Sequence, residues 1–448
     1  MRLRNAAAGT LAGFLFAPAA YGQQIDTARA LAGLRDALTV CRADGGALWN
    51  HDLCGPIALA DRQTRMALLN DSVPRRHYLR LADAFVTVLP DNQFVANTSF
   101  PWGGREWTMV SLPLPADRYA RVALVMHEVF HREQKVIGLG ALDALNNHLD
   151  FRAGRTWLRL EYRALGAALS SADDAEARHH AADAMLFRAM RRSLYPGADS
   201  TEALLEIQEG LPEYTGQRLA MQLTGAGPER VAQYLQEFER NTPTFVRAFA
   251  YATGPAIGTL LDRFAPRWRD DIKTRRDLSG LLVQAIKFVP PARLADEANR
   301  RAQSYEWAEI DVSEAARDSS RAPTMNGYRA RFGAGPTIAL RQARDSLTWG
   351  YDPTALIAFD QRNLIYPSGS FGAPWGRLQV DSNAVLVAND FSIIRVSVRP
   401  GAVQVGASGT IRGDGWQLQL NPGWRLDADP QRPGSFIVST SRPGYPSG

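Results

Sequence analysis

Residues 124–134 read Leu-Val-Met-His-Glu-Val-Phe-His-Arg-Glu-Gln, and this stretch decides which fold the chain is expected to adopt. His127 and His131 are four residues apart, so a helix through the stretch places both imidazoles on one face. The residues just before them, Val122–Val125, are apolar, which predicts a buried helix. The two histidines are therefore expected inside the protein and beside its core.

The same stretch contains the pattern His-Glu-x-x-His, whose residue types suit metal-assisted hydrolysis. Two imidazoles on one helix face can bind one metal ion, and zinc is the ion that commonly takes such ligands. Zinc supplies Lewis acidity, and Glu128 would accept a proton from the attacking water as general base. The alternative is a pair of core histidines with a helical glutamate, and the flanking features favour the metal site.

A third metal ligand must come from later in the chain, where two glutamates are candidates. Glu161 lies on the apolar stripe of a helix predicted over residues 155–169, where a lone carboxylate is costly unless it is neutral, paired or metal-bound. The alternative for Glu161 is an ion pair with a buried arginine. Glu209 lies in the segment Glu-Ile-Gln-Glu-Gly-Leu-Pro-Glu-Tyr, residues 206–214. The residues alone leave both candidates open.

The His-Glu-x-x-His pattern followed by Glu-Gly-Leu-Pro-Glu-Tyr resembles the gluzincin branch of zinc metallopeptidases. In several gluzincin families a later helix carries Glu-Gly-Leu/Phe-Ala-Glu-Tyr or a near variant, and its first glutamate binds zinc. The resemblance spans about residues 105–265. It implies that His127, His131 and Glu209 hold zinc and that Glu128 is the general base.

Two features of the chain differ from the gluzincin pattern. Pro212 stands where that pattern has alanine, and the chain runs on for 78 residues from His131 to Glu209, which is more than family members need. A helical hairpin over residues 142–195 is expected to fill this gap. Glu161 lies 30 residues after His131, which is closer to the usual spacing.

Other residues near these motifs are candidates for contact with substrate. A strand is predicted over residues 107–112, shortly before the motif helix, and in this superfamily an edge strand at that place pairs with extended substrate. Trp107 and Met109 of this strand are therefore substrate-binding candidates. Glu213 and Tyr214 beside the second motif are further candidates, and core packing is the alternative for Tyr214.

An acidic stripe recurs at helical spacing through the second motif and consists of Glu202, Glu206, Glu209 and Glu213. It is either a solvated face paired with arginines or a cleft wall that binds a cationic group of the substrate. Tyr251, near a glycine and a proline in a later helix, is a candidate for stabilising an oxyanion. Ordinary core packing is the alternative for Tyr251.

The first 22 residues resemble an export signal. Two arginines precede an apolar run at residues 6–20, and residues 20–22, Ala-Tyr-Gly, match a small-x-small cleavage site. No later apolar run approaches the length of a membrane span, so a periplasmic or secreted protein without a transmembrane segment is expected after signal removal. Cys41 and Cys54 are expected to form a disulfide in that oxidising environment.

Composition excludes several classes of protein. The 448 residues are 45% hydrophobic and 22% charged, which is typical of globular domains and excludes a disordered or fibrous chain. The 51 basic residues are 48 Arg and three Lys, scattered among 46 acidic residues for a net charge of +5. A nucleic-acid-binding surface usually clusters its basic residues on one face, so no nucleic-acid partner is expected.

Strand-like runs flank a long helical region, so the expected fold class is α+β. The expected parts are a signal peptide at 1–22, an N-terminal helix and β region at 23–115, a helical zincin-like catalytic domain at 116–325 and a C-terminal β domain at 332–448. The expected function is hydrolysis of peptide or protein substrates by an exported zinc metallopeptidase. The alternative is a non-catalytic zincin-fold binding or scaffold protein of the cell envelope.

Overall fold

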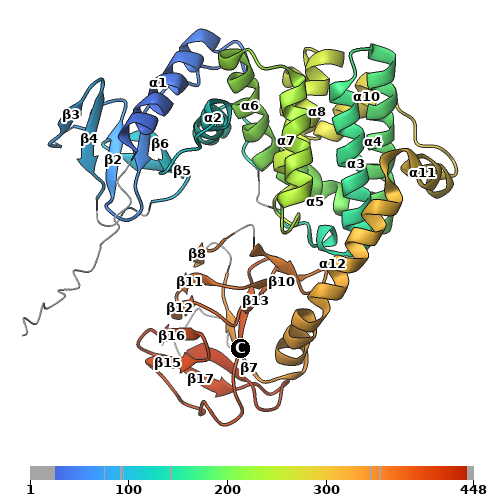
Figure 1. Cartoon of the computed structure of the whole chain (residues 1–448). Coiled ribbons are helices and arrows are strands. Elements are labelled where there is room, and N and C mark those ends of the chain that lie inside the picture. The colour runs from blue at the N-terminus through green and yellow to red at the C-terminus, as the bar shows by residue number, and fades with distance from the viewer. Residues whose placement is uncertain are drawn as a thin grey trace, which may run out of the picture.

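The chain folds into three parts that follow one another along the sequence, as the blue-to-red colouring of Figure 1 shows. This computed structural model describes residues 26–440, apart from residues 75, 91, 92, 94, 142, 143, 344, 345, 353 and 354. The expected export signal therefore lies outside the described residues. A mixed N-terminal part, a helical centre and a strand-rich C-terminal part confirm the expected mixture and order of helices and strands.

The N-terminal part consists of one helix packed beside a mixed sheet. Helix α1 begins after Asp26, whose side chain accepts a hydrogen bond from the Arg29 amide, and it ends at Gly45 in the left-handed conformation. A disulfide joins Cys41 of α1 to Cys54 just before the sheet, which confirms the expected pair. The elements are α1 (Thr27–Asp44), β1 (Ile57–Ala60), β2 (Met66–Leu69), β3 (Leu79–Leu81), β4 (Ala84–Val88), β5 (Thr98–Trp102) and β6 (Arg105–Ser111).

The strand order in this sheet is β3-β4-β2-β1-β6-β5, so β6 lies between two neighbours. The prediction of an edge strand at residues 107–112 is therefore wrong, and β5 is the strand at that edge. A turn at Gly103 and Gly104, whose φ angles of 59° and 81° suit a two-residue hairpin, folds β5 back onto β6. Pro101 in β5 fits an edge position because proline cannot donate a ladder hydrogen bond. Residues 47–49 form a turn after α1.

The helical centre is built from helices joined mostly by short loops. α2 packs along α6, and α3 packs along α4 as the hairpin expected between the two motifs (Figure 1). None of the helices in the described part of the chain is both long and apolar enough to cross a membrane. The elements are α2 (Arg118–Gln134), η1 (Asn147–Asp150), α3 (Arg152–Ser170), α4 (Asp174–Leu194), α5 (Ala198–Leu205), η2 (Glu206–Gly210), α6 (Leu211–Thr224), α7 (Pro228–Asn241), α8 (Phe249–Phe264), α9 (Trp268–Arg275), α10 (Leu278–Ile286), α11 (Leu294–Ala302), η3 (Gln303–Tyr305), α12 (Trp307–Tyr328) and η4 (Arg329–Ala334).

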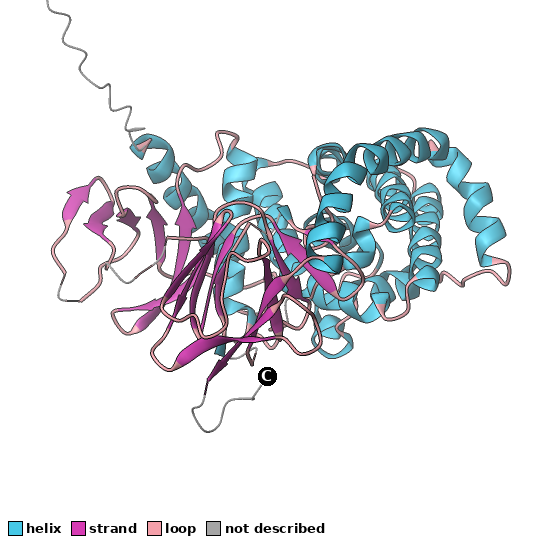
Figure 2. Ribbon diagram, turned by 90° about the horizontal axis from the view of Figure 1, so that it is seen from below, coloured by secondary structure: helices cyan, strands magenta, loops and turns pink. Residues whose placement is uncertain are grey.

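The C-terminal part consists of strands in two sheets, drawn in magenta in Figure 2. The strand orders are β17-β18-β7-β14-β13-β10-β9 and β15-β16-β12-β11-β8. Trp375, Trp416 and Trp424 are buried in its core, whereas Trp349 is 42% exposed. The strands are β7 (Thr337–Arg341), β8 (Thr348–Gly350), β9 (Ile357–Ala358), β10 (Asn363–Tyr366), β11 (Gly369–Ala373), β12 (Gly376–Val380), β13 (Val385–Ala388), β14 (Ile393–Ser397), β15 (Thr410–Gly413), β16 (Trp416–Leu420), β17 (Trp424–Ala428) and β18 (Phe436–Thr440).

Buried polar contacts fix the C-terminal part on the short η1 segment of the helical centre. Asn147 donates from Nδ2 to the carbonyl of Asp360 at 2.8 Å. Asp150 accepts from the Ala358 amide at 2.8 Å and pairs with Arg321 of α12 at 2.7 Å. Because η1 lies between α2 and α3, these contacts fix the C-terminal part relative to the motif helix.

Candidate metal centre

The motif helix α2 is held in the core by its contact with α6. Asp117 caps the first turn of α2 through its side chain. The two helices approach closely at Gly216 of α6, where an added Cβ would lie 2.2 Å from the carbonyl oxygen of Ala123. Glycine is therefore required at this contact, which brings α6 against the turn that carries His127. His127 is 3% exposed and Glu128 is 6% exposed, so the motif is buried as predicted.

The second motif lies on an irregular stretch of helix. The π-helical turn η2 (Glu206–Gly210) joins α5 to α6, and Pro212 is the second residue of α6. Because proline has no amide hydrogen, a carbonyl one turn earlier lacks its usual helical donor. Gln134 of α2 supplies a donor, since its Nε2 donates to the carbonyl of Ile207 at 2.7 Å. The difference from the gluzincin pattern at Pro212 thus coincides with an irregular turn that carries Glu209 and is tied to α2.

Three side-chain atoms from these two segments converge on one point. The Nε2 atoms of His127 and His131 are 3.0 Å apart. Oε2 of Glu209 lies 3.4 Å from His131 Nε2 and 3.6 Å from His127 Nε2. Ligand atoms around a tetrahedral zinc ion, with bonds of about 2.0–2.1 Å, are about 3.3 Å from one another. The spacing fits such an ion, and these three residues could hold a metal.

The hydrogen bonds of the two imidazoles direct their lone pairs toward the same point. His127 Nδ1 lies 2.8 Å from Glu213 Oε2, and His131 Nδ1 lies 3.0 Å from Gln134 Oε1. Both partners are acceptors, so each Nδ1 carries the hydrogen and each Nε2 keeps a lone pair. Two lone pairs and a carboxylate oxygen at these distances repel one another unless a cation lies between them. This set of nitrogen and oxygen donors suits zinc.

When no metal ion is bound, a proton can supply the positive charge at this point. Burial opposes a charged His127, but its contacts with Glu209 and Glu213 raise the pKa of this imidazole to about 10. Burial also opposes a charged Glu209, yet the two neighbouring histidines and the charge of Arg247 hold its pKa well below the ordinary value. The site therefore stabilises a cation between its side chains.

Two side chains outside the motifs orient Glu209. Arg247 donates from Nη2 to Oε1 at 3.0 Å, and the hydroxyl of Tyr251 donates to Oε2 at 2.6 Å. The ring of Tyr251 stacks on His127 with centroids 5.5 Å apart and 3° between the planes. The sequence-predicted Tyr251 thus lies in the site. Arg247 and Gln134 are site residues that the sequence analysis missed, since neither belongs to a recognisable motif.

Glu128 lies beside the three converging atoms and lines the same cleft. Burial raises the pKa of this carboxyl, while the neighbouring His127 and His131 act in the opposite direction. A carboxylate with a raised pKa is a more effective proton acceptor near neutral pH. The position and the environment of Glu128 both suit a general base.

Glu161, the other candidate ligand, does not lie near the histidines. It is completely buried, and its carboxylate pairs with Arg188 at 2.6 Å and with Arg191 at 2.5 Å. The ion-pair alternative is therefore correct, and the metal-ligand prediction for Glu161 is wrong. Helical spacing placed Glu161 on the buried stripe of α3, but that stripe packs against α4, from which both arginines come.

Three of the substrate-binding candidates lie in cores instead of in the cleft. Trp107 and Met109 are two residues apart on β6, so they share a face of the strand, and that face is covered by a hydrophobic cluster. Tyr214 is also completely buried, and its hydroxyl donates to Asp262 at 2.8 Å. The fourth candidate, Glu213, lines the cleft, where it accepts from the imidazole of His127.

The three converging atoms lie at a cleft of about 2000 Å³, and residues from all three parts of the chain line this cleft. The N-terminal sheet contributes residues 98–101 of β5, the helical centre contributes α2, and the C-terminal part contributes residues 349–352 and 368–370. The sequence did not predict that the C-terminal part lines this cleft. Its position depends on the η1 contacts, which join residues more than 200 positions apart.

Comparisons with protein-family models, with curated proteins and with solved structures find no match to this chain. Function is therefore inferred from the residues of the site and their geometry.

Proposed function

We propose that this protein is an exported zinc metallopeptidase with a zincin-like fold, which hydrolyses peptide bonds in peptide or protein substrates. The observation that carries the proposal is the convergence of His127 Nε2, His131 Nε2 and Glu209 Oε2 beside Glu128 in an open cleft. Two histidines and one glutamate are a donor set of catalytic zinc sites, which leave one coordination position for water or substrate. The resemblance to gluzincins supports the same assignment.

Each residue of the site has a role in the proposed reaction. When bound, zinc acts as a Lewis acid toward the scissile carbonyl and makes water a stronger nucleophile. Glu128 accepts the proton of the attacking water and delivers it to the leaving amine. Glu213 and Gln134 hold the Nδ1 atoms, so the imidazoles keep their orientation and tautomer. Tyr251 is the proposed oxyanion donor, for which its hydroxyl must turn from Glu209 toward the substrate.

An extended peptide is proposed to lie along β5. This strand is the edge of the N-terminal sheet, and residues 98–101 of it line the cleft. An extended chain can add to such an edge through main-chain hydrogen bonds, which need no particular side chains. β5 thus replaces the strand at residues 107–112 as the proposed substrate-side strand, because β5 pairs with the side of β6 that would otherwise be the edge of the sheet.

Export is proposed from two independent features. The disulfide between Cys41 and Cys54 is typical of oxidising compartments. The signal-like residues 1–22 predict the same destination, although they lie outside the described residues. A periplasmic or secreted location fits both features.

The alternative function is a non-catalytic zincin-fold protein that binds a partner in the cell envelope. A closed cleft or the loss of the general base would favour this alternative. Glu128 is present here and lines a cleft of about 2000 Å³, so the peptidase is the better-supported proposal.

The decisive test replaces Glu128 by glutamine in the mature chain. The wild type should bind about one zinc ion per chain and cleave peptides from a mixed fluorogenic library. Glu128→Gln should keep the zinc but lose roughly 10²- to 10⁴-fold in kcat, since the variant lacks the proton acceptor. A wild type that never holds zinc, or a variant that is as active as the wild type, would overturn the proposal.

A further inference from the structure

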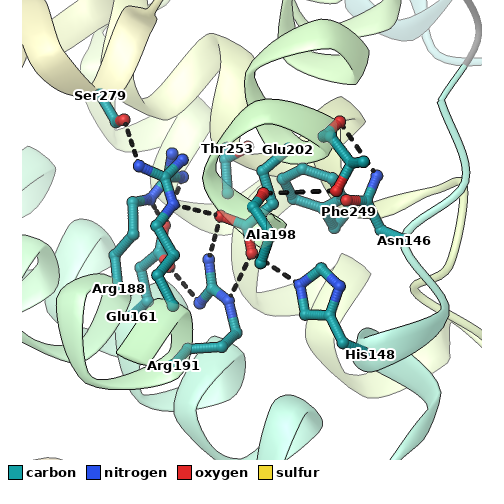
Figure 3. A network of polar contacts seen from close by, with 12 residues as sticks. Asn146, His148, Glu161, Arg188, Arg191, Ala198, Glu202, Phe249, Thr253 and Ser279 are labelled. Carbon is teal, nitrogen blue, oxygen red and sulfur yellow. Dashed lines mark hydrogen bonds and ion pairs between the residues drawn. The ribbon is translucent and has the colours of Figure 1, made fainter. Parts of the chain in front are cut away.

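The π-helical turn that carries Glu209 is also anchored on the side away from the cleft. The anchor is a buried charge cluster, which we define as Glu161, Glu202, Glu206, Arg188 and Arg191. Figure 3 shows Glu161, Glu202, Arg188 and Arg191 of this cluster. Each of these side chains is at most 2% exposed. Four of the five lie outside η2, so the cluster links this turn to distant parts of the helical centre.

Arg188 is the member of the buried charge cluster that pairs with Glu206 of the π-helical turn. Its Nη1 and Nη2 atoms donate to the two carboxylate oxygens of Glu206 at 2.9 and 2.7 Å. The same guanidinium donates from Nε to Glu161 at 3.0 Å. Arg191 instead pairs with Glu161 and with Glu202 at 2.8 Å. A bidentate arginine–carboxylate pair fixes direction as well as distance, so Arg188 determines where Glu206 points.

Because the cluster is buried, any departure from this paired geometry is costly. Burial opposes the charge on Arg188, but Glu161 and Glu206 outweigh it and hold the pKa of the guanidinium well above the ordinary value. Burial likewise opposes a charged Glu202, whose pKa is nevertheless held well below the ordinary value by Arg191 and its neighbours. Charged groups in a buried site are stable only in well-formed pairs, so displacement of one partner is strongly disfavoured.

A second helix holds the same carboxylate. Thr253 of α8 donates from its hydroxyl to Oε1 of Glu206 at 2.6 Å. The next residue, Gly254, lies so close to Gly210 that an added Cβ would be 2.3 Å from the Gly210 Cα. Both ends of η2 are thus held, by α4 and α8 at Glu206 and by α8 at Gly210.

We propose that Arg188 is a positioning residue of the metal centre, which acts through Glu206 to place the Glu209 carboxylate against the two histidines. A π-helical turn has weaker main-chain constraints than an α-helix, so side-chain anchors decide its course. The inference rests on the proposed metal site. It assigns a role to the hairpin of α3 and α4, which lies between the two ligand segments in sequence and supplies both arginines and Glu161.

The test compares Arg188→Met with Arg191→Met in the full mature chain. Each variant removes one completely or almost completely buried arginine that pairs with Glu161, so both should lose stability to a similar degree in urea. Arg188→Met alone should raise the zinc Kd, by about tenfold to hundredfold, as is usual when support of a ligand is lost. Zinc affinity is measured by competition with a chromophoric chelator. Cobalt(II) substituted for zinc should show a changed visible spectrum in Arg188→Met and an unchanged one in Arg191→Met.

A milder pair of variants decides the question if an arginine variant does not fold. Thr253→Val removes the hydroxyl bonded to Glu206 and keeps the shape of the side chain. Thr259→Val is its control on the same helix, because the buried Thr259 hydroxyl has no hydrogen-bond partner among the described residues. Thr253→Val should raise the zinc Kd about tenfold and alter the cobalt spectrum. Thr259→Val should do neither.

The outcomes separate this inference from the proposed function. A wild type that binds zinc, together with folded Arg188→Met or Thr253→Val that binds it equally well and with the same cobalt spectrum, would overturn the positioning role alone. A wild type that binds no zinc would overturn both. Weaker binding in Arg191→Met and Thr259→Val to the same extent would also overturn the inference, since the effect would then be general loss of packing.

Discussion

Replacing Gly216 by alanine should loosen the metal centre although the residue touches no ligand side chain. An alanine Cβ at this position would lie 2.2 Å from the carbonyl oxygen of Ala123 and 3.2 Å from the amide nitrogen of His127. The first distance is more than 1 Å short of the 3.4 Å at which ordinary contact begins. Both neighbours are backbone atoms of α2 and cannot rotate away, so α6 must move from α2.

The size of the effect follows from two opposing contributions. Alanine is the better helix former by about 1 kcal/mol, whereas forcing extra volume into a packed contact costs about 1–3 kcal/mol or more. Gly216→Ala should therefore lower the free energy of unfolding by up to about 2 kcal/mol. Gly166→Ala in α3 is the matched control, because its Cβ would meet only Leu235 at an ordinary 3.8 Å. That variant should gain up to about 1 kcal/mol, the opposite sign.

The assay is urea unfolding of both variants with and without zinc, together with the zinc Kd. Metal sites tolerate ligand displacements of about 0.2 Å, so movement of α6 should raise the Kd of Gly216→Ala at least tenfold. Gly166→Ala should bind zinc like the wild type. If Gly216→Ala were as stable as Gly166→Ala and bound zinc normally, the close contact of α6 with α2 would not position the site.

Three further predictions concern the ligand set, the buried charge cluster and the disulfide. Glu209→Ala should reduce bound zinc from about one ion per chain to nearly none, whereas Glu237→Ala, which removes another carboxylate of the cleft, should keep it; elemental analysis of dialysed protein checks this. Burial opposes charge on Glu202, but Arg191, His148 and Arg192 hold the pKa of this carboxyl well below 4.5. The ionised Glu202 therefore stabilises the fold at neutral pH, and this stabilisation declines as the pH falls below about 4.5. The urea concentration at the unfolding midpoint should therefore be lower at pH 4 than at pH 7. This decrease should be smaller in Glu202→Gln than in the wild type. An equal decrease would mean that other titrating groups cause the loss of stability. Replacing Cys41 and Cys54 by serine should lower the free energy of unfolding by about 3 kcal/mol, since the bond closes a short loop; a change below about 1 kcal/mol would show that the loop is held by packing alone.

Local spacing was sufficient to predict the helix of the first motif. Two histidines at i and i+4 share a helix face whatever surrounds them, and the apolar run beside them correctly predicted burial of the helix. The disulfide was also predictable, because the chain has two cysteines and they are 13 residues apart. In both cases the deciding contacts lie within one short stretch of chain.

Positions that depend on contact between distant segments were predicted less well. The strand at residues 107–112 was identified, but its place in the sheet depends on β5, whose short, proline-containing sequence gives a weak strand pattern. Trp107 was assigned to the cleft because its strand was expected at the substrate-side edge, and Tyr214 because it lies beside the second motif. The pleat of β6 and the turn of α6 direct both side chains into cores instead.

The choice between Glu161 and Glu209 shows where the sequence reaches its limit. Both are glutamates downstream of the histidines, and the structure buries both, so each carboxylate requires a cation. The sequence by itself determined the helix that offers two imidazoles and the glutamate between them, and it placed Glu161 on an apolar stripe. Only the tertiary structure decided which cation each carboxylate meets, because α4 brings Arg188 and Arg191 to Glu161 while α6 lies on α2 and brings Glu209 to the histidines. The physical reason is that periodicity fixes which residues share a face, whereas helix packing over a gap of 78 residues fixes what that face meets.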